Sequence, residues 1–269
     1  MARRIHHVVQ QRSSVRGIEA MTLVSNHHFP RHSHDQFGFG MIAFGAQRSW
    51  SSLGQVEASE GDVIFCNPGE MHDGIPLDGK VRGWRIVYLD PALISRAIGE
   101  EIAGELEIAR PVARDPLLAE HLVRLFAALT GPAPDRLACE EILIRSVMCV
   151  ARRHGTRKPA SSNAASPSVA KAVQRIDCAP NESVSLGELA ALAGVSRFQL
   201  LRGFDREIGT TPHAYLIQRR VCFAKRLLAA GETPAQAAIE AGFADQSHMT
   251  RAFVRYLGIT PSRYQVAVS

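Results

Sequence analysis

Two histidines that stand one residue apart, His32 and His34, occur in the stretch FPRHSHDQFGFG. Alternate residues of a β-strand point to the same face, so an extended backbone here would direct both imidazoles into one space. Imidazole nitrogens bind divalent transition metals, and they also hydrogen-bond small polar ligands. The pair therefore poses a choice between a metal site, with the prospect of enzyme chemistry, and a ligand pocket.

The composition is that of an ordinary globular protein with room for two domains. Of the 269 residues, 46% are hydrophobic and 21% are charged, which is enough apolar surface for two cores. No apolar run reaches the ~18 residues that would span a bilayer, and the N-terminus lacks the apolar stretch of a secretory signal. The cysteines are odd in number and scattered without a CxxC pair, which predicts reduced thiols in a cytoplasmic protein. They are Cys66, Cys139, Cys149, Cys178 and Cys222.

Changes in the character of the sequence predict the domain boundaries of a two-domain α+β protein. Residues 20–90 hold short β-branched and aromatic stretches separated by Gly, Pro and Asp, typical of an antiparallel sandwich or small barrel. The stretch GTRKPASSNAASP, residues 155–167, has no aliphatic side chain larger than alanine and predicts a flexible linker. We therefore expect a β-sandwich or barrel with a helical tail at 1–154, and an all-α domain at 168–269.

Two amphipathic helices are expected in that helical tail. The first runs from Asp115 to Thr130, with an Asp-Pro start and Gly131 after its end. The second, from Pro134 to His154, carries basic residues in its last turn. Their apolar stripes predict packing against the β-rich domain or against the same helices of a second copy. We expect a homodimer.

The region after the linker contains an internal repeat. Residues 202–215, RGFDREIGTTPHAY, match residues 251–264, RAFVRYLGITPSRY, without a gap. Both stretches follow the pattern R-x-F-x4-G-x-T-P-x2-Y. A repeat of this kind predicts one supersecondary unit that is used twice.

Each copy of the repeat is preceded by the signals of a helix-turn-helix unit. Gly194 and Gly242 mark the turns. Ser196 is suited to cap the second helix of the first unit, and the second helix of the other unit is expected to start near Asp245. Between the units, a helix from His213 to Ala230 would span roughly 27 Å. A rigid spacer of that length would hold the two second helices about one DNA turn apart, ~34 Å, so that one chain reads an asymmetric site.

Residues 168–269 resemble the DNA-binding domain of AraC-type (AraC/XylS) transcription regulators. The densest match is AGFADQSHMTRAFVRYLGITPSRY, residues 241–264. The resemblance implies that helices at 196–204 and 245–253 enter adjacent major grooves. We expect DNA contacts from the exposed side chains of these helices, namely Arg197, Phe198, Leu201, Arg202, Gln246, Ser247, Thr250 and Arg251. Phosphate contacts are expected from Arg219, Arg220 and Arg255.

The first of these helices has apolar residues at DNA-facing positions where polar or aromatic residues are common in the family. Phe198 and Leu201 stand where Trp or Gln is common. Apolar side chains can contact the methyl group of thymine, or they can pack within the protein. Both readings remain open for these two residues.

The N-terminal domain resembles the cupin-like sensory domain that such regulators often carry, through HSHDQFGFGMIAFG and GDVIFCNPGEMHDG. In metal-binding cupins these motifs supply two His and a Glu, then a third His, and the matching histidines here are His32, His34 and His72. The glutamate is missing, and the second motif is one residue shorter. We therefore expect the three histidines, with Trp50 and Tyr88, to line an effector pocket that holds neither a metal nor a cofactor. A sensing or structural metal on the histidines is the alternative.

These features predict a sequence-specific transcription regulator of the cytoplasm, and not an enzyme. Its partners would be a small-molecule effector, double-stranded promoter DNA and RNA polymerase, with no membrane contact. The alternative is a cupin metalloenzyme fused to a helical DNA-binding module, against which the missing glutamate weighs. A DNA-repair or methyl-transfer protein would need an activated cysteine, but Cys66 lies in an apolar run and Cys222 in an expected helix.

Overall fold

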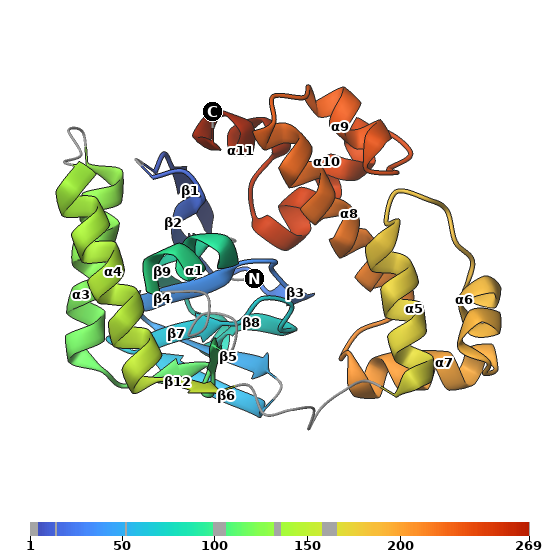
Figure 1. Cartoon of the computed structure of the whole chain (residues 1–269), viewed down its shortest axis with the longest axis horizontal. Coiled ribbons are helices and arrows are strands. Elements are labelled where there is room, and N and C mark those ends of the chain that lie inside the picture. The colour runs from blue at the N-terminus through green and yellow to red at the C-terminus, as the bar shows by residue number, and fades with distance from the viewer. Residues whose placement is uncertain are drawn as a thin grey trace. The chain divides into compact units, whose positions relative to one another are not determined.

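The computed structural model describes residues 5–13, 15–51, 53–98, 106–131, 136–157 and 166–268. Its contacts divide the chain into two compact units, with the division between residues 158 and 159 (Figure 1). The first unit is built mainly from strands and the second from helices, as the sequence predicts. Within the described ranges, no helix combines the length and the apolar character that a bilayer crossing requires.

The first unit holds a six-stranded and a four-stranded antiparallel sheet. The strand order is β1-β2-β9-β4-β7-β11 in one sheet and β3-β8-β5-β6 in the other, while β10 pairs with β12. The strands are β1 (His6–Gln11), β2 (Ile18–Ser25), β3 (Phe29–His32), β4 (Phe37–Phe44), β5 (Ala46–Ser51), β6 (Gly54–Ser59), β7 (Val63–Cys66), β8 (His72–Pro76), β9 (Arg82–Leu89), β10 (Leu106–Ile108), β11 (Val112–Ala113) and β12 (Gly155–Arg157). A 3-10 turn, η1 (Leu77–Gly79), and helix α1 (Pro91–Ile98) complete the β-rich part.

One face of the six-stranded sheet packs against helices α3 (Pro116–Thr130) and α4 (Arg136–Arg153) and forms the core with them (Figure 1). Strand alternation decides which residues enter this core. In β4, Phe37 and Phe39 are part of it. The expected helix start is confirmed at Asp115, whose carboxylate accepts a hydrogen bond from the backbone N–H of Leu118 at 3.2 Å.

The four-stranded sheet packs on the opposite face of the six-stranded sheet. Phe29 of β3 lies edge-on to Trp84 of β9, with the ring centroids 6.0 Å apart. Arg82 of β9 is fully buried between the sheets. Its guanidinium donates to Gln47 Oε1 and to the carbonyl oxygens of Ser25, His27 and Gly74, at 3.0–3.2 Å. These acceptors offset the cost of burying the charge and tie the two sheets together.

The stretch expected as a linker is structured at both ends. Residues Gly155–Arg157 form β12, which pairs antiparallel with β10. Helix α5 begins at Pro167 with Ser166 as its N-cap, and Ser166 also donates to the carboxylate of Glu207. The expected linker of 155–167 is therefore too long at both ends. Local sequence does not show β12, because its partner Glu107 lies 49 residues from Thr156. Residues 158–165 lie outside the described part of the chain.

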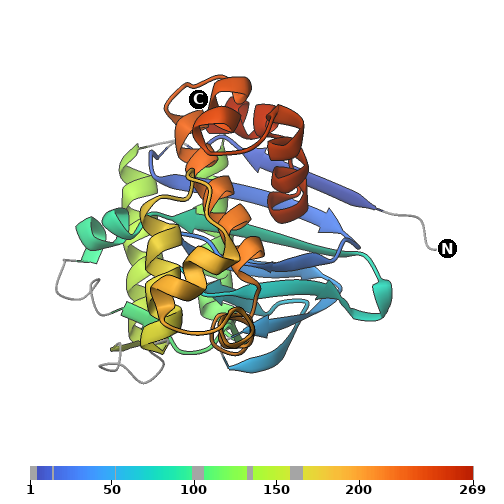
Figure 2. The ribbon, with the colours of Figure 1, turned by 90° about the vertical axis from the view of Figure 1, so that its right-hand side faces the viewer.

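The second unit consists of two helix-turn-helix units joined by a long helix. Its helices are α5 (Pro167–Cys178), α6 (Leu186–Ala193), α7 (Arg197–Glu207), α8 (Pro212–Ala229), α9 (Pro234–Glu240), α10 (Gln246–Leu257) and α11 (Pro261–Val268). Figures 1 and 2 show α8 running from the group α5–α7 to the group α9–α11. The expected spacer from His213 to Ala230 thus agrees with α8 to within one residue at each end.

The internal repeat of the sequence is also a repeat of packing. Phe204 and Tyr215 meet edge to face, with centroids 6.1 Å apart and an interplanar angle of 68°. Their counterparts Phe253 and Tyr264 make the same contact at 6.2 Å and 66°. Both phenylalanines are fully buried. The shared pattern therefore encodes the same local core twice.

The start of the second helix of each helix-turn-helix unit, α7 and α10, is fixed by its own cap. Ser196 and Gln199 cap each other reciprocally at the start of α7, the capping-box arrangement. Asp245 accepts from the backbone N–H of His248 at 2.6 Å at the start of α10. The structure confirms the expected cap at Ser196 and the expected helix start near Asp245, which is the N-cap of α10.

Candidate functional site

Helix α7 presents the expected DNA-contacting side chains to solvent. Phe198 and Leu201 are exposed by 66% and 38%, so neither is a core residue. Arg197 and Arg202 are exposed on the same helix. The helix can expose these side chains because its opposite face, with Leu200 among others, supplies the core.

Helix α10 presents the equivalent positions of the second repeat. Gln246, Ser247 and Arg251 are exposed. Thr250 differs, since it is half-buried and its hydroxyl donates to the carbonyl of Gln246 at 2.8 Å. The structure thus gathers the expected residues on two equivalent helix faces, and their contact with DNA stays a prediction.

Two of the arginines expected at phosphates are engaged within the second unit. Arg219 Nε lies 2.9 Å from Asp177 Oδ1, and the Arg219 side chain is 18% exposed. Arg220 donates to the carbonyl oxygens of Pro180 at 2.8 Å and Glu182 at 3.2 Å, and burial lowers its pKa. Both residues therefore connect α8 to the end of α5 and to the segment after it.

The third of these arginines, Arg255 on α10, is exposed. Its counterpart in the first repeat is Arg206 on α7, whose side chain is 74% exposed and pairs with Glu207. Sequence reasoning missed Arg206 as a phosphate-binding candidate. The repeat itself is the signal that points to it, because Arg206 and Arg255 occupy the same position of the shared pattern.

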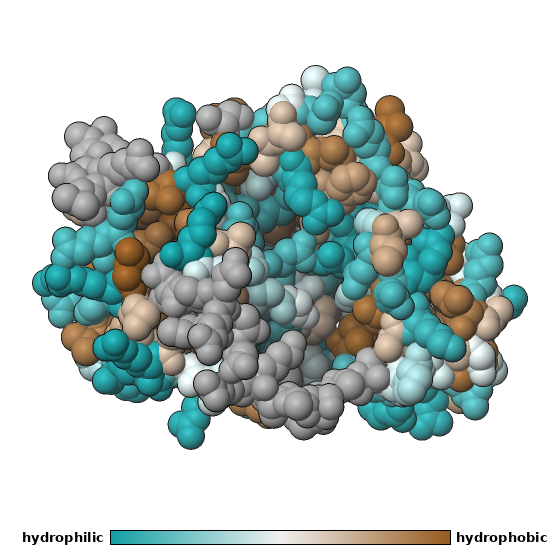
Figure 3. Space-filling model, viewed as in Figure 1, coloured by the Kyte–Doolittle hydropathy of each residue, from teal (hydrophilic) through white to brown (hydrophobic). Residues whose placement is uncertain are grey.

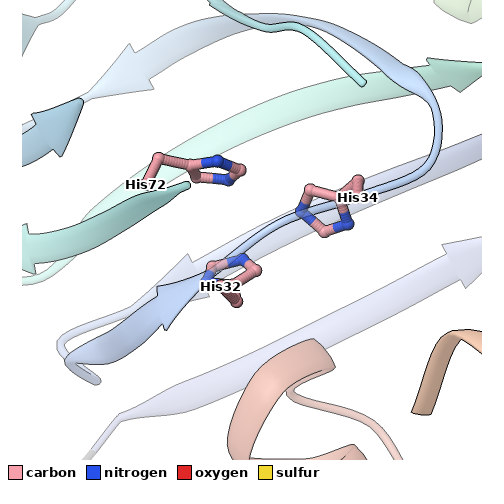
Figure 4. A group of neighbouring side chains, drawn as sticks. All are labelled: His32, His34 and His72. Atoms are coloured by element: carbon pink, nitrogen blue, oxygen red, sulfur yellow. The ribbon is translucent and has the colours of Figure 1, made fainter. Parts of the chain in front are cut away.

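The histidines His32, His34 and His72 lie together in the first unit (Figure 4). One ring nitrogen from each lies within 4.8 Å of those of the other two. His32 and His34 are each 7% exposed. Because β3 ends at His32 and His34 follows it, strand alternation alone does not explain the convergence. His32 pairs directly with His72, the first residue of β8.

The turn before β8 completes the cluster. The backbone N–H of Gly69 donates to the carbonyl of His34 at 2.7 Å. Glu70 accepts from the backbone and the side-chain amide of Asn67 at 3.1 and 2.9 Å. Gly69 has φ +75°, a conformation that glycine adopts without strain. This turn sets the start of β8 and brings His72 to the other two rings.

Backbone carbonyls fix the protons of two rings. Nδ1 of His32 lies 2.7 Å from the oxygen of Pro30, and Nδ1 of His72 lies 3.0 Å from the oxygen of Glu70. A carbonyl oxygen only accepts, so each Nδ1 carries a hydrogen and each neutral ring has its lone pair on Nε2. Burial and the neighbouring His72 lower the pKa of His32 to about 3. Burial also lowers the pKa of His72, so both rings are neutral at pH 7.

Tyr88 of β9 borders this cluster. Its ring centroid lies 4.5 Å from that of His34, and its hydroxyl lies 3.4 Å from His34 Nε2. Gly38 of β4 makes room for the tyrosine ring, because a Cβ there would lie 3.2 Å from Tyr88 Cε1 and would collide with Cys66 Sγ. The absence of a side chain at position 38 therefore helps to position Tyr88.

Trp50, the fifth residue expected in the pocket, has other partners. Its ring lies under the guanidinium of Arg31, 4.1 Å from the centroid. Its backbone N–H donates to Asp73 Oδ1 at 2.6 Å. The structure thus brings together the three histidines and Tyr88, and it places Trp50 with Arg31 and Asp73. The role of all five residues in effector binding stays a prediction.

The two helices of the first unit expose a few apolar side chains. Figure 3 shows apolar side chains among polar ones over α3 and α4. Leu117, Val123 and Ile144 are exposed by 50%, 39% and 44%. Leu118, Leu125 and Val147 are buried within the unit, and Ile142 and Met148 are partly buried against the same core. Most of the apolar stripes are therefore satisfied within the chain.

Comparison with known proteins agrees with this arrangement. A model of AraC-like ligand binding domains matches residues 14–147, and a model of helix-turn-helix domains matches residues 189–266. The chain is 30% identical over 232 residues to YbfI of Bacillus subtilis, an uncharacterized HTH-type transcriptional regulator, covering 82% of this chain and 81% of YbfI. It is 28% identical over 234 residues to an AraC-like transcription regulator of Streptomyces antibioticus, covering 81% and 75%.

Among solved structures, ToxT from Vibrio cholerae has a similar fold. The TM-score is 0.55 at 12% sequence identity, with 99% of this chain and 98% of ToxT covered. At this identity the likeness concerns the fold alone. It extends over both units, the strand-rich one and the helical one.

Proposed function

We propose, from the premise that this chain belongs to the AraC-type transcription regulators, that α7 and α10 read adjacent major grooves of one promoter site. The observation that carries this proposal is the equivalence of the two helices. Both helices bury three matching positions, Leu200, Gly203 and Phe204 on α7 and Met249, Ala252 and Phe253 on α10. Both also expose the matching pairs Arg197 and Gln246, Phe198 and Ser247, and Arg202 and Arg251. A major groove admits one α-helix, so two equivalent helices suit two successive grooves.

The exposed side chains of the two helices would make different kinds of contact with DNA. Arg251 can donate two hydrogen bonds to the acceptors of a guanine, and Gln246 can donate one to an adenine and accept one from it. Phe198 and Leu201 can contact thymine methyl groups but carry no hydrogen-bonding group. We therefore assign polar base reading mainly to α10, and shape and methyl contacts mainly to α7.

The N-terminal ligand-binding domain would control this DNA binding. We place the effector pocket around His32, His34, His72 and Tyr88, with Trp50 near it. An effector changes DNA binding only if it binds two arrangements of the protein with different affinity. The relatives are transcription regulators, which weighs against the metalloenzyme alternative.

We further propose a homodimer formed through α3 and α4. The exposed Leu117, Val123 and Ile144 are the side chains that a second copy would cover. The dimer would act in the cytoplasm, where its promoter DNA and RNA polymerase are found. Sedimentation of the protein with Ile144→Glu, compared with Glu140→Lys on the same helix, tests the interface, and a dimer that survives Ile144→Glu contradicts it.

The central experiment is a mobility shift of the intergenic DNA upstream of the protein's own gene. Retention that survives an excess of random DNA is the expected result. The double variant Gln246→Ala/Arg251→Ala should lose this retention, while Arg124→Ala in the first unit should keep it. The proposal is contradicted if the unsubstituted protein retains specific and random DNA equally, and if the double variant does the same.

A further inference from the structure

The histidine cluster has the donor set of a metal site. Within the described ranges, His32, His34 and His72 are the group of potential ligand residues that converges, and all three offer imidazole nitrogen. Imidazole suits zinc, copper, nickel and iron, whereas magnesium and calcium prefer oxygen ligands. Three protein ligands with an open fourth position are a familiar arrangement for a zinc ion that keeps a water molecule or accepts a ligand.

The spacing of the rings is close to what an ion requires. Zinc-nitrogen bonds of about 2.0–2.1 Å at tetrahedral angles separate the ligand nitrogens by roughly 3.3 Å. The nitrogens here all lie within 4.8 Å of one another. A bound ion would therefore draw the three nitrogens closer together by up to ~1.5 Å.

The surroundings already orient two of the rings as ligands. A metal-bound histidine typically donates its other ring N–H to a carbonyl or carboxylate. His32 does so to Pro30 and His72 to Glu70, so the lone pair of each neutral ring is on Nε2. The carboxylates of Glu70 and Asp73 act electrostatically on the ring of His72, and that of Asp73 is also paired with Arg31 at 3.8 Å.

We propose that His32, His34 and His72 bind one divalent transition-metal ion of the zinc class inside the N-terminal domain. The fourth coordination position then faces a water molecule or an anionic group of the effector. This proposal adopts the alternative given in the sequence analysis, a sensing or structural metal on the three histidines. It goes beyond the DNA-binding function. It does not depend on α7 or α10, so its failure leaves the DNA-binding proposal intact.

The test uses the full-length chain, stripped of metal with a chelator and titrated with Zn²⁺ by calorimetry and with Co²⁺ by visible absorption. One equivalent should bind per chain. His32→Ala and His72→Ala should weaken binding by roughly 100-fold or more, because even second-shell losses cost ~10–100-fold. His28→Ala is the matched control, since His28 is exposed and lies outside the cluster.

Zinc-edge X-ray absorption of the unsubstituted protein gives a second measurement that does not require the variants to fold. It should report three imidazole nitrogens at about 2.0 Å. The proposal is overturned if the stripped protein binds no metal, or if thiolate ligands dominate the spectrum. It is also overturned if folded His32→Ala binds as tightly as His28→Ala. The mobility shift of promoter DNA, measured on the same preparations, reports the DNA-binding function separately.

Discussion

The guanidinium of Arg202 lies over the ring of Phe198, 5.7 Å from its centroid, on the exposed face of α7. The pair presents an apolar surface next to a positive charge, which suits a thymine methyl group beside a phosphate. We expect Phe198→Ala to lower specific DNA affinity by ~1 kcal/mol, about fivefold, because one apolar base contact is lost.

Operators in which deoxyuridine replaces thymidine test this contact directly. At one or more thymines of the operator, removal of the methyl group should weaken binding by the unsubstituted protein. At the same thymines it should not change the affinity of the Phe198→Ala variant. Leu192→Ala is the control, because Leu192 is 49% exposed on α6 and not on a recognition helix. If the unsubstituted protein and Phe198→Ala lose the same affinity at every substituted thymine, Phe198 does not contact a methyl group.

On α10, Gln246→Ala and Arg251→Ala should each cost ~1–3 kcal/mol in binding to the specific site, because each would remove paired hydrogen bonds to a base. Thr250→Ala should cost ~0.5 kcal/mol or less, since its hydroxyl already donates to the Gln246 carbonyl. Competition titrations against specific and random DNA provide the measurement. A loss that is the same on both DNAs would show that these residues do not read bases.

Phosphate contacts should appear in the salt dependence of binding. Arg255→Ala and Arg206→Ala should each reduce the slope of log affinity against log salt by about one unit, because one fewer counterion is released. Arg124→Ala provides the baseline, since Arg124 is an exposed arginine of the other unit that pairs with Glu120. If Arg255→Ala leaves the slope of log affinity against log salt unchanged, Arg255 does not contact a phosphate.

Arg220 should behave differently from these two arginines. Arg220→Ala leaves the carbonyl oxygens of Pro180 and Glu182 without this donor. We expect it to lower the free energy of unfolding of the second unit by ~1–3 kcal/mol. Thermal unfolding followed by circular dichroism measures this change, with Arg226→Ala on the same helix as the control. Full stability combined with a reduced salt slope would instead support the phosphate contact.

The carboxylate of Asp115 should make the stability of the first unit depend on pH. Burial alone would raise the pKa of Asp115, but hydrogen bonds from Arg153, His154 and the N–H of Leu118 outweigh it and lower the pKa to about 2. Because the folded-state pKa lies below the ordinary value of 3.8, the stabilisation is complete above about pH 4 and is lost as the pH falls to about 2.

Tryptophan fluorescence during urea unfolding can follow this loss, since Trp50 and Trp84 both lie in the first unit. Asp115→Asn keeps a capping side chain but loses the charge, so it should be less stable at pH 7 and should lose less between pH 4 and pH 2. Asp78→Asn, at an exposed surface pair with Lys80, should resemble the unsubstituted protein. The same pH profile for Asp115→Asn and the unsubstituted protein contradicts the assignment.

The helical unit could be read from the sequence because its signals are local. Caps such as Ser196 and Asp245, and glycines such as Gly194 with φ +70°, lie within a few residues of the helices that they define. The repeat then doubled each signal. What the sequence could not show is that Arg219 and Arg220 are engaged, because their partners lie about forty residues earlier in the chain.

The histidine cluster depends on contacts between distant segments. Spacing alone relates His32 to His34, but the strand ends between them, and the Gly69–His34 hydrogen bond is what draws the segments together. Strand β12 was not predicted for the same reason, because it forms by pairing with β10, which is distant in the sequence. In both cases tertiary contacts overrode the local pattern.

The two recognition helices keep their inner faces and differ on their outer faces. Leu200 and Met249 are both buried large apolar residues at the same repeat position, whereas Phe198 and Ser247 share an exposed position with unlike chemistry. Exposed substitutions usually change stability by ~0.5 kcal/mol or less. In the proposed DNA-binding role, mutations on the outer faces would change the DNA sequence that is bound while the buried faces preserve the fold, so that a duplicated gene of this kind could acquire new target genes without loss of stability.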